Sequence, residues 1–83
     1  METRVSVIEV LGPGCARCHE TYRVVRHVVD EAKLACAVRK DESVERMVDL
    51  GVLQTPAIAF DGRVVFSGRI PGSDDVRRLL GLV

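Results

Sequence analysis

The sequence places two cysteines three positions apart, Cys15 and Cys18, after an apolar segment and at the start of a long amphipathic one. Two thiols at this spacing in the first turn of a helix can close a small disulfide. The unpaired N–H groups and the positive dipole end of that turn stabilise a thiolate at the first position. Because a thiolate is both a nucleophile and a metal ligand, the pair predicts either thiol chemistry or soft-metal binding.

The segments around the two cysteines predict a strand followed by a helix. Val5 to Leu11 is nearly continuous in apolar residues, which is typical of a strand buried on both faces. Gly12 to Gly14 ends this strand. From Ala16 to Leu34, apolar and charged residues separate onto two arcs at helical spacing, with Cys18 inside the apolar arc and Cys15 at its rim. We therefore expect Cys15 to be accessible and Cys18 to be sheltered.

A second strand and a short helix are predicted next. Ala35 to Lys40 is expected to form the strand, and Asp41 or Ser43 can cap the helix that follows. Gly51 is the stop signal of this helix. Its expected inward side chains are those of Val44, Met47 and Val48.

The last part of the chain predicts a hairpin and a final helix. Ala57 to Phe60 and Arg63 to Phe66 are joined by Asp61-Gly62, a strong signal for a two-residue turn. Ser73 can cap the final helix, in which Asp74 and Asp75 suit the first turn and arginines the last. Its expected inward side chains are those of Val76, Leu79 and Leu80.

The order of elements is thus β-α-β-α-β-β-α. The first crossover is a βαβ unit, so its two strands should be parallel and its connection right-handed. The hairpin adds two antiparallel strands. We expect an α/β fold with a mixed four-stranded sheet flanked by three helices on both faces, in a single domain over residues 1–83.

Composition narrows the classes of function. Apolar residues make up 47% of the chain, and twelve acidic residues balance twelve basic ones. A balanced charge favours neither nucleic-acid nor membrane binding. No apolar run approaches the length of a membrane span and no secretion leader is recognisable, so we expect a cytoplasmic monomer. Three cysteines cannot form a fully paired disulfide framework, and in a reducing compartment a Cys-x-x-Cys is more often catalytic or metal-binding than structural.

Two motifs together resemble the thioredoxin superfamily. Gly12 to Cys18 resembles the Gly-x-Gly-Cys-x-x-Cys of small, glutaredoxin-sized redox-active disulfide proteins, and Thr55-Pro56-Ala57 resembles their Thr-Pro-Ala. The stretch from Gly68 to Pro71 is also similar. The dipeptide Ala16-Arg17 departs from the Gly-Pro of thioredoxins. The resemblance implies a thioredoxin-like fold and a thiol–disulfide oxidoreductase without a bound cofactor.

The resemblance also implies roles for four residues. Cys15 is expected to attack a substrate disulfide, and Cys18 to resolve the mixed disulfide that results. Pro56 is expected to be a cis-proline facing the dithiol, with Thr55 offering its backbone to an extended substrate segment. The expected partners are a disulfide-containing protein or small molecule, and a flavoprotein reductase of the thioredoxin type or glutathione as electron donor.

Three further residues are expected to modulate the dithiol. Arg17 adds positive charge that favours the Cys15 thiolate. Glu9 matches the offset of a buried acid in thioredoxins and could accept a proton if it is desolvated, or could instead reach solvent at the strand end. His19, in the first helical turn, could modulate the local field.

Two other classes of function stay open on the sequence. Cys36 and His19 could complete a soft-metal or metalloid site with Cys15 and Cys18, although the second clustered pair of a strong zinc site is missing. We expect no metal there and an inert, half-buried Cys36. The segment Cys15 to His19 also has the form of a haem attachment motif, which the absence of an export signal argues against. The remaining alternative is a degenerate thioredoxin-like interaction domain.

Overall fold

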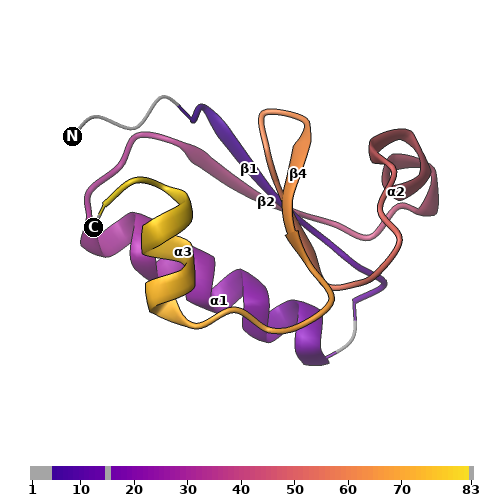
Figure 1. Ribbon diagram of the computed structural model, residues 1–83, viewed down its shortest axis with the longest axis horizontal. Helices are drawn as coiled ribbons and strands as arrows, with labels where there is room; N and C mark the ends of the chain where they lie inside the picture. The colour runs from indigo at the N-terminus through magenta and orange to yellow at the C-terminus, as the bar shows by residue number, and fades with distance from the viewer. Residues whose placement is uncertain (1–4, 15, 83) are drawn as a thin grey trace.

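The computed structural model describes residues 5–14 and 16–82. Its elements follow the predicted order: β1 (Val7–Leu11), α1 (Ala16–Glu31), β2 (Ala37–Asp41), α2 (Val44–Leu50), β3 (Ala57–Phe60), β4 (Arg63–Ser67) and α3 (Ser73–Leu79). The sheet has the strand order β2-β1-β3-β4. β1 and β2 are parallel, and the β1–β3 and β3–β4 pairs are antiparallel. The predicted α/β architecture with a mixed sheet and three helices is confirmed (Figure 1).

Alternating residues of β1 face two different helical layers. Ile8 and Val10 belong to the larger core cluster, which α1 and α3 cover with side chains such as Val25 and Val76. Leu11 belongs to a smaller cluster against which α2 packs. Figure 1 shows α1 and α3 together on one side of the sheet and α2 on the other. β1 is therefore a central strand with both faces covered, which explains its nearly unbroken apolar sequence.

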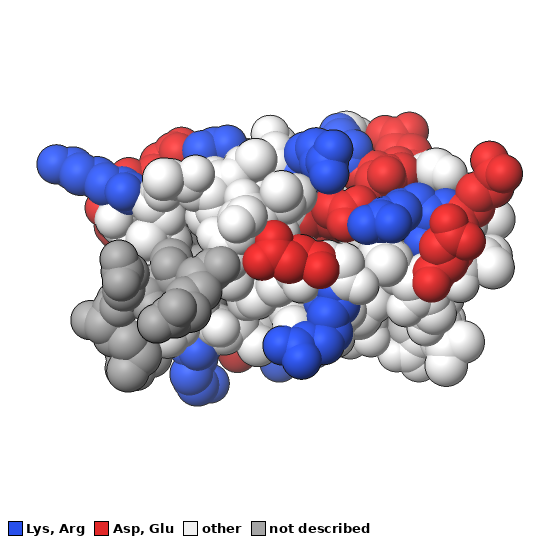
Figure 2. Space-filling model, turned by 90° about the horizontal axis from the view of Figure 1, so that it is seen from above, with Lys and Arg blue, Asp and Glu red and all other residues white. Residues whose placement is uncertain are grey.

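Helix α2 begins and ends where the sequence predicts, but it turns a different face to the sheet. The Arg46 backbone N–H donates to Ser43 Oγ at 3.2 Å, and Gly51 ends the helix with a φ of 72°. The expected burial of Val44 and Val48 is wrong, because these residues are 70% and 71% exposed. Met47 and Leu50 pack on the smaller cluster instead. Acidic side chains gather at this end of the molecule (Figure 2).

The hairpin turn is formed by Asp61 and Gly62, which have φ angles of 49° and 85°. Positive φ at both central residues is the geometry that suits a two-residue hairpin, and glycine and aspartate tolerate it. The Asp61 carboxylate also accepts hydrogen bonds from the backbone N–H groups of Ser6 and Val7, at 2.8 to 3.1 Å. The turn therefore anchors the start of β1 at the far end of the sheet from Gly12.

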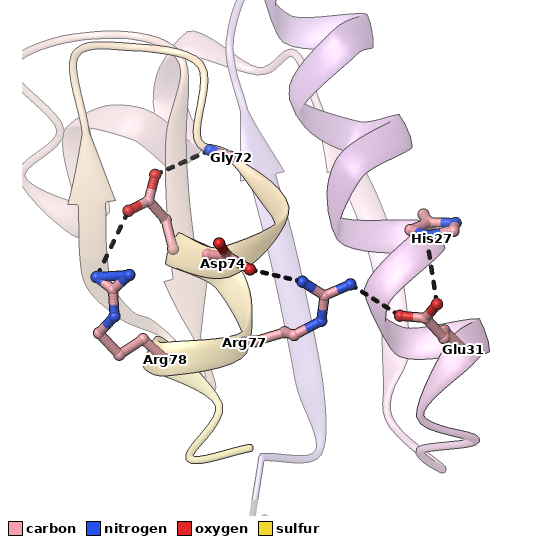
Figure 3. A network of polar contacts seen from close by, with 7 residues as sticks. His27, Glu31, Gly72, Asp74, Arg77 and Arg78 are labelled. Carbon is pink, nitrogen blue, oxygen red and sulfur yellow. Dashed lines mark hydrogen bonds and ion pairs between the residues drawn. The ribbon is translucent and has the colours of Figure 1, made fainter. Parts of the chain in front are cut away.

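Helix α3 starts one residue earlier than a Ser73 cap would require. Gly72 is the N-cap, and its N–H donates to Asp75 Oδ2 at 2.9 Å, so the aspartate side chain rather than the serine hydroxyl closes the first turn. Arg77 ties α3 to α1 through Glu31 at 2.9 Å and also contacts Asp74 at 2.8 Å (Figure 3). Val76 and Leu80 are buried, as expected, whereas Leu79 is only half-buried. No helix in residues 5–14 and 16–82 has the length and apolarity needed to span a bilayer.

Candidate dithiol site

The two sequence motifs meet at one end of the sheet. β1 runs to Leu11, and the N–H of the next residue, Gly12, donates to the Asp41 carbonyl at the end of β2 at 3.1 Å. Leu11 pairs with Ala57, the residue that follows Pro56. The Gly-Pro-Gly loop and the Thr-Pro segment are therefore neighbours in space although more than forty positions separate them in sequence.

Cys18 lies within α1 and is fully buried, as predicted. Its Sγ packs against the backbone of Gly12 so closely that a Cβ added to Gly12 would overlap the sulfur. The same Cβ position is 3.7 Å from the Cβ of Thr55. Gly12 thus lies between the sheltered thiol and the Thr-Pro segment, and only a residue without a side chain fits there.

Cys15, the predicted nucleophile, lies outside the described residues, but the residue before it has a defined environment. Gly14 has a φ of 82°, which favours glycine. The Glu42 carboxylate lies against this glycine, with both oxygens about 3 Å from the position that a Cβ would occupy. A carboxylate of the β2–α2 loop therefore flanks the dithiol motif on its N-terminal side.

The Thr55–Pro56 peptide bond is cis. Pro56, directly before β3, is buried, and Thr55 is half-buried. The Pro56 carbonyl accepts a hydrogen bond from the Gly68 N–H at 3.0 Å, which fixes the Thr-Pro segment to the end of β4.

Gly68 is a meeting point of three segments. The Gly68 carbonyl accepts a hydrogen bond from Arg17 Nη2 at 3.2 Å, so the exposed Arg17 side chain reaches from the first turn of α1 to the β4–α3 loop. The Gln54 side chain packs on the Gly68 backbone, where an added Cβ would overlap its Oε1. Together with the Gly68–Pro56 hydrogen bond, these contacts place Arg17 beside the Thr-Pro segment.

Glu9 is buried in β1 with 4% of its surface exposed, so it does not reach solvent freely. Arg46 of α2 donates to both of its oxygens, from Nε at 2.9 Å and from Nη2 at 2.7 Å. The hydrogen bonds to Glu9 raise the pKa of Arg46. Glu9 therefore faces the layer of α2, whereas Cys18 belongs to the helix on the other layer.

His19 is exposed and contacts β2. The Lys40 ammonium lies 2.7 Å from His19 Nδ1, so this ring nitrogen accepts a hydrogen bond. Lys40 also lies over the Tyr22 ring, 5.9 Å from its centroid. The histidine thus belongs to a surface cluster on the outer side of α1.

The sequence predicted Cys36 within the second strand, but Cys36 directly precedes β2. It is buried, and burial raises the pKa of its thiol. Five residues of extended chain separate it from Asp41 at the dithiol end, which is about 16 Å at 3.3 Å per residue. Cys36 therefore cannot share a metal with Cys18. Within the described part of the chain, no three His, Cys, Asp or Glu side chains are grouped to hold a metal ion.

Comparison with known proteins identifies the family. A model of the thioredoxin domain matches residues 6–81 of this sequence. The chain belongs to the thioredoxin-domain family. A thioredoxin of Methanocaldococcus jannaschii is 34% identical over 74 residues, covering 89% of this chain and 85% of that protein. A thioredoxin of Methanothermobacter thermautotrophicus is 25% identical over 73 residues, covering 88% of this chain and 95% of that protein.

This thioredoxin domain is a redox protein of the thioredoxin type, and its site includes residues that sequence reasoning did not single out. These residues contact site residues that are distant in sequence: Arg46 binds Glu9, Gln54 packs on Gly68, and Glu42 lies against Gly14. The sequence indicated Gly68 only as the first residue of the stretch from Gly68 to Pro71 that is similar to the family. Gly68 has a φ of 96°, a backbone conformation that favours glycine, and this preference is the local signal that the sequence carries for the position.

Proposed function

We propose that this chain is a thiol–disulfide oxidoreductase that cycles Cys15 and Cys18 between dithiol and disulfide. The observation that carries the proposal is the convergence at Gly12, which contacts the buried Cys18 sulfur and lies beside Thr55, the residue before the cis-proline. Membership of the thioredoxin-domain family supports the same chemistry.

In the proposed reaction the Cys15 thiolate attacks one sulfur of a substrate disulfide. The substrate S–S bond breaks, a mixed disulfide forms with Cys15, and the first substrate thiolate leaves and takes a proton. The deprotonated Cys18 then attacks the Cys15 sulfur, releasing the second substrate thiol and closing the Cys15–Cys18 disulfide. The substrate gains two electrons and two protons, and the dithiol loses them.

The neighbouring residues have distinct proposed roles. The free N–H groups at the start of α1 and the charge of Arg17 favour the Cys15 thiolate. Thr55 offers its backbone to an extended substrate segment next to Pro56. Glu9 lies on the α2 side of β1 and not against Cys18, so its proposed role is to take the Cys18 proton through an intervening water during closure, with Arg46 fixing its carboxylate. His19 adjusts the local field from the surface.

The oxidised pair needs an electron donor to return to the dithiol. We propose a flavoprotein reductase of the thioredoxin type or glutathione, either of which supplies two electrons through thiol–disulfide exchange. Disulfide-containing proteins or small molecules are the proposed substrates, in a reducing compartment such as the cytoplasm.

Trapping separates the roles of the two cysteines. Cys18→Ser should accumulate a mixed disulfide with a peptide disulfide, because attack survives and resolution does not, whereas Cys15→Ser should trap nothing. Cys36→Ser is the matched control and should turn over like the native chain. Intact-mass spectrometry reads each outcome. Trapping by Cys15→Ser, or loss of turnover in Cys36→Ser, would contradict the assignment.

A further pair of measurements tests the remaining roles. Glu9→Gln should slow closure of the mixed disulfide by about tenfold or more at neutral pH, if Glu9 is the proton acceptor. An unchanged closure rate would leave Glu9 as a structural partner of Arg46. Elemental analysis of the reduced protein, purified without added metal, should find no stoichiometric soft metal; a full complement would favour the alternative of a metal-binding dithiol.

A further inference from the structure

Most arginines of this chain are neutralised by a carboxylate. Six of those within residues 5–14 and 16–82 form an ion pair: Arg23, Arg26, Arg46, Arg69, Arg77 and Arg78. Arg17, like Arg39 and Arg63, forms no ion pair with any carboxylate in the described part of the chain, and its guanidinium donates instead to the backbone carbonyl of Gly68. A guanidinium has five N–H donors, so Arg17 keeps donors and a full charge for another group.

The position of this charge is fixed by the contacts of Gly68. Gly68 accepts from Arg17 through its carbonyl and donates to the Pro56 carbonyl through its N–H. Arg17 therefore projects its charge along the Thr-Pro side of the dithiol. Its side chain is exposed, so a substrate can reach it.

A charge of the opposite sign lies at the other end of the motif. Glu42 is exposed, and its carboxylate rests on the Gly14 backbone, next to the N-terminal side of the dithiol. Glu42 forms no ion pair with the cations that the structure describes. The motif from Gly14 to Arg17 therefore has an unpaired negative charge at its start and an unpaired positive charge at its end.

We propose that Arg17 makes the site selective for disulfides with a carboxylate beside the reacting cysteine, and that Glu42 restricts such a carboxylate to the Arg17 side. This inference rests on the proposed function and adds the substrate class. Exposed ion pairs contribute about 0.2 to 1 kcal/mol, which corresponds to a factor of up to about five in rate constant for each favourable or unfavourable contact. An acidic substrate gains from Arg17 and a basic one is disfavoured by it, so the two preferences multiply.

Selectivity distinguishes this role from an effect of Arg17 on the thiolate. A change in Cys15 reactivity alters the rate constants of all substrates by the same factor, whereas a contact with the substrate alters their ratio. The ratio of rate constants for an acidic and a basic substrate is therefore the informative quantity.

The experiment uses two peptide disulfides that differ at one position. Both carry the same cysteine as a mixed disulfide with 2-mercaptoethanol, and the next residue is Asp in one peptide and Lys in the other. Single-turnover reduction by the fully reduced, full-length protein gives a second-order rate constant for each. We expect the Asp peptide to react about two- to twenty-five-fold faster at low salt, and the ratio to fall towards one at 1 M salt because the charges are screened.

Variants assign the selectivity to the two charges. Arg17→Gln should bring the ratio close to one, Arg17→Lys should keep most of it, and Glu42→Gln should speed the Asp peptide. Arg63→Gln, which removes the same charge at the hairpin end of the sheet, should leave the ratio unchanged. A native ratio within twofold of one, or an unchanged ratio in Arg17→Gln, would overturn the inference. If the native protein reduced neither peptide, the proposed function itself would fail instead.

Discussion

The guanidinium of Arg46 holds the buried carboxylate of Glu9 by two hydrogen bonds, at 2.7 and 2.9 Å. The two residues are 37 positions apart in sequence. Two-point contact between a guanidinium and a carboxylate fixes distance and orientation together. The pair thereby joins α2 to the central strand β1 through a layer that holds few large apolar side chains.

Loss of Arg46 should destabilise the fold. Arg46→Met leaves the Glu9 carboxylate buried without its cation, which is the costly way to break such a pair. We expect a lower midpoint of urea unfolding than in the native chain. Arg63→Met, which removes an arginine that forms no ion pair in the described part of the chain, should shift the midpoint little. Equal shifts in the two variants would show that the Glu9 contact contributes nothing.

Gly12→Ala should impair both stability and chemistry. The added Cβ would overlap the Cys18 sulfur, so the thiol or the loop has to move. Overpacking of this kind costs about 1 to 3 kcal/mol, and displacement of Cys18 should slow closure of the mixed disulfide. Gly72→Ala is the matched control, because a Cβ there meets Asp75 Oδ2 at an ordinary 3.6 Å. Normal closure kinetics in Gly12→Ala would argue against the close fit.

Cys36 should be the slow thiol, and its contribution to stability should decrease at alkaline pH. Burial raises the pKa of its thiol above the ordinary value of 9.0. Below pH 9 both the folded and the unfolded state keep the proton; above it the unfolded state loses the proton first, so stability falls as pH rises. The difference in unfolding midpoint between the native chain and Cys36→Ala should therefore narrow above pH 9. Near neutral pH, peptide mapping after iodoacetamide treatment should find Cys36 labelled more slowly than Cys15.

Asp75 should stabilise the fold only while it is ionised. The N–H of Gly72 and then the Arg69 guanidinium hold the pKa of this carboxyl below its ordinary value of 3.8. Its contribution is therefore present above about pH 3.8 and is lost as pH falls through the lower folded-state value. Asp75→Asn should unfold at lower urea than the native chain at pH 7, and the two should converge in acid. Asp74→Asn, in the same turn but without the capping bond, should have the smaller effect at pH 7.

Local patterns were enough for the order of elements and for the sheltered position of Cys18. Asp61-Gly62 predicted its turn because the required φ angles depend on those two residues alone. The face of α2 was not predictable in this way. In a helix of seven residues the apolar pattern is too short to decide, and the buried Glu9 draws Arg46, rather than Val44, towards the sheet.

The site shows the same division between local and distant causes. The Cys-x-x-Cys and Thr-Pro motifs were recognisable from consecutive residues, but the residues that contact these motifs in the fold were not predictable from the sequence. The contact between Arg17 and Gly68 spans 51 positions, and nothing in either local sequence points to the other. Glu42 approaches Gly14 only because β2 ends beside β1.

Helix α2 has a consequence for local unfolding. None of its seven residues is fully buried, so the ion pair of Arg46 and the partial burial of Met47 and Leu50 hold it in place. Segments with few buried apolar contacts open at a lower free energy than the whole domain. We therefore expect the backbone amides of α2 to exchange with solvent through an opening that leaves α1 and the sheet intact. Since α2 leads through residues 51–54 into Thr55 and Pro56, one wall of the dithiol site is joined to a helix that we expect to open more easily than α1.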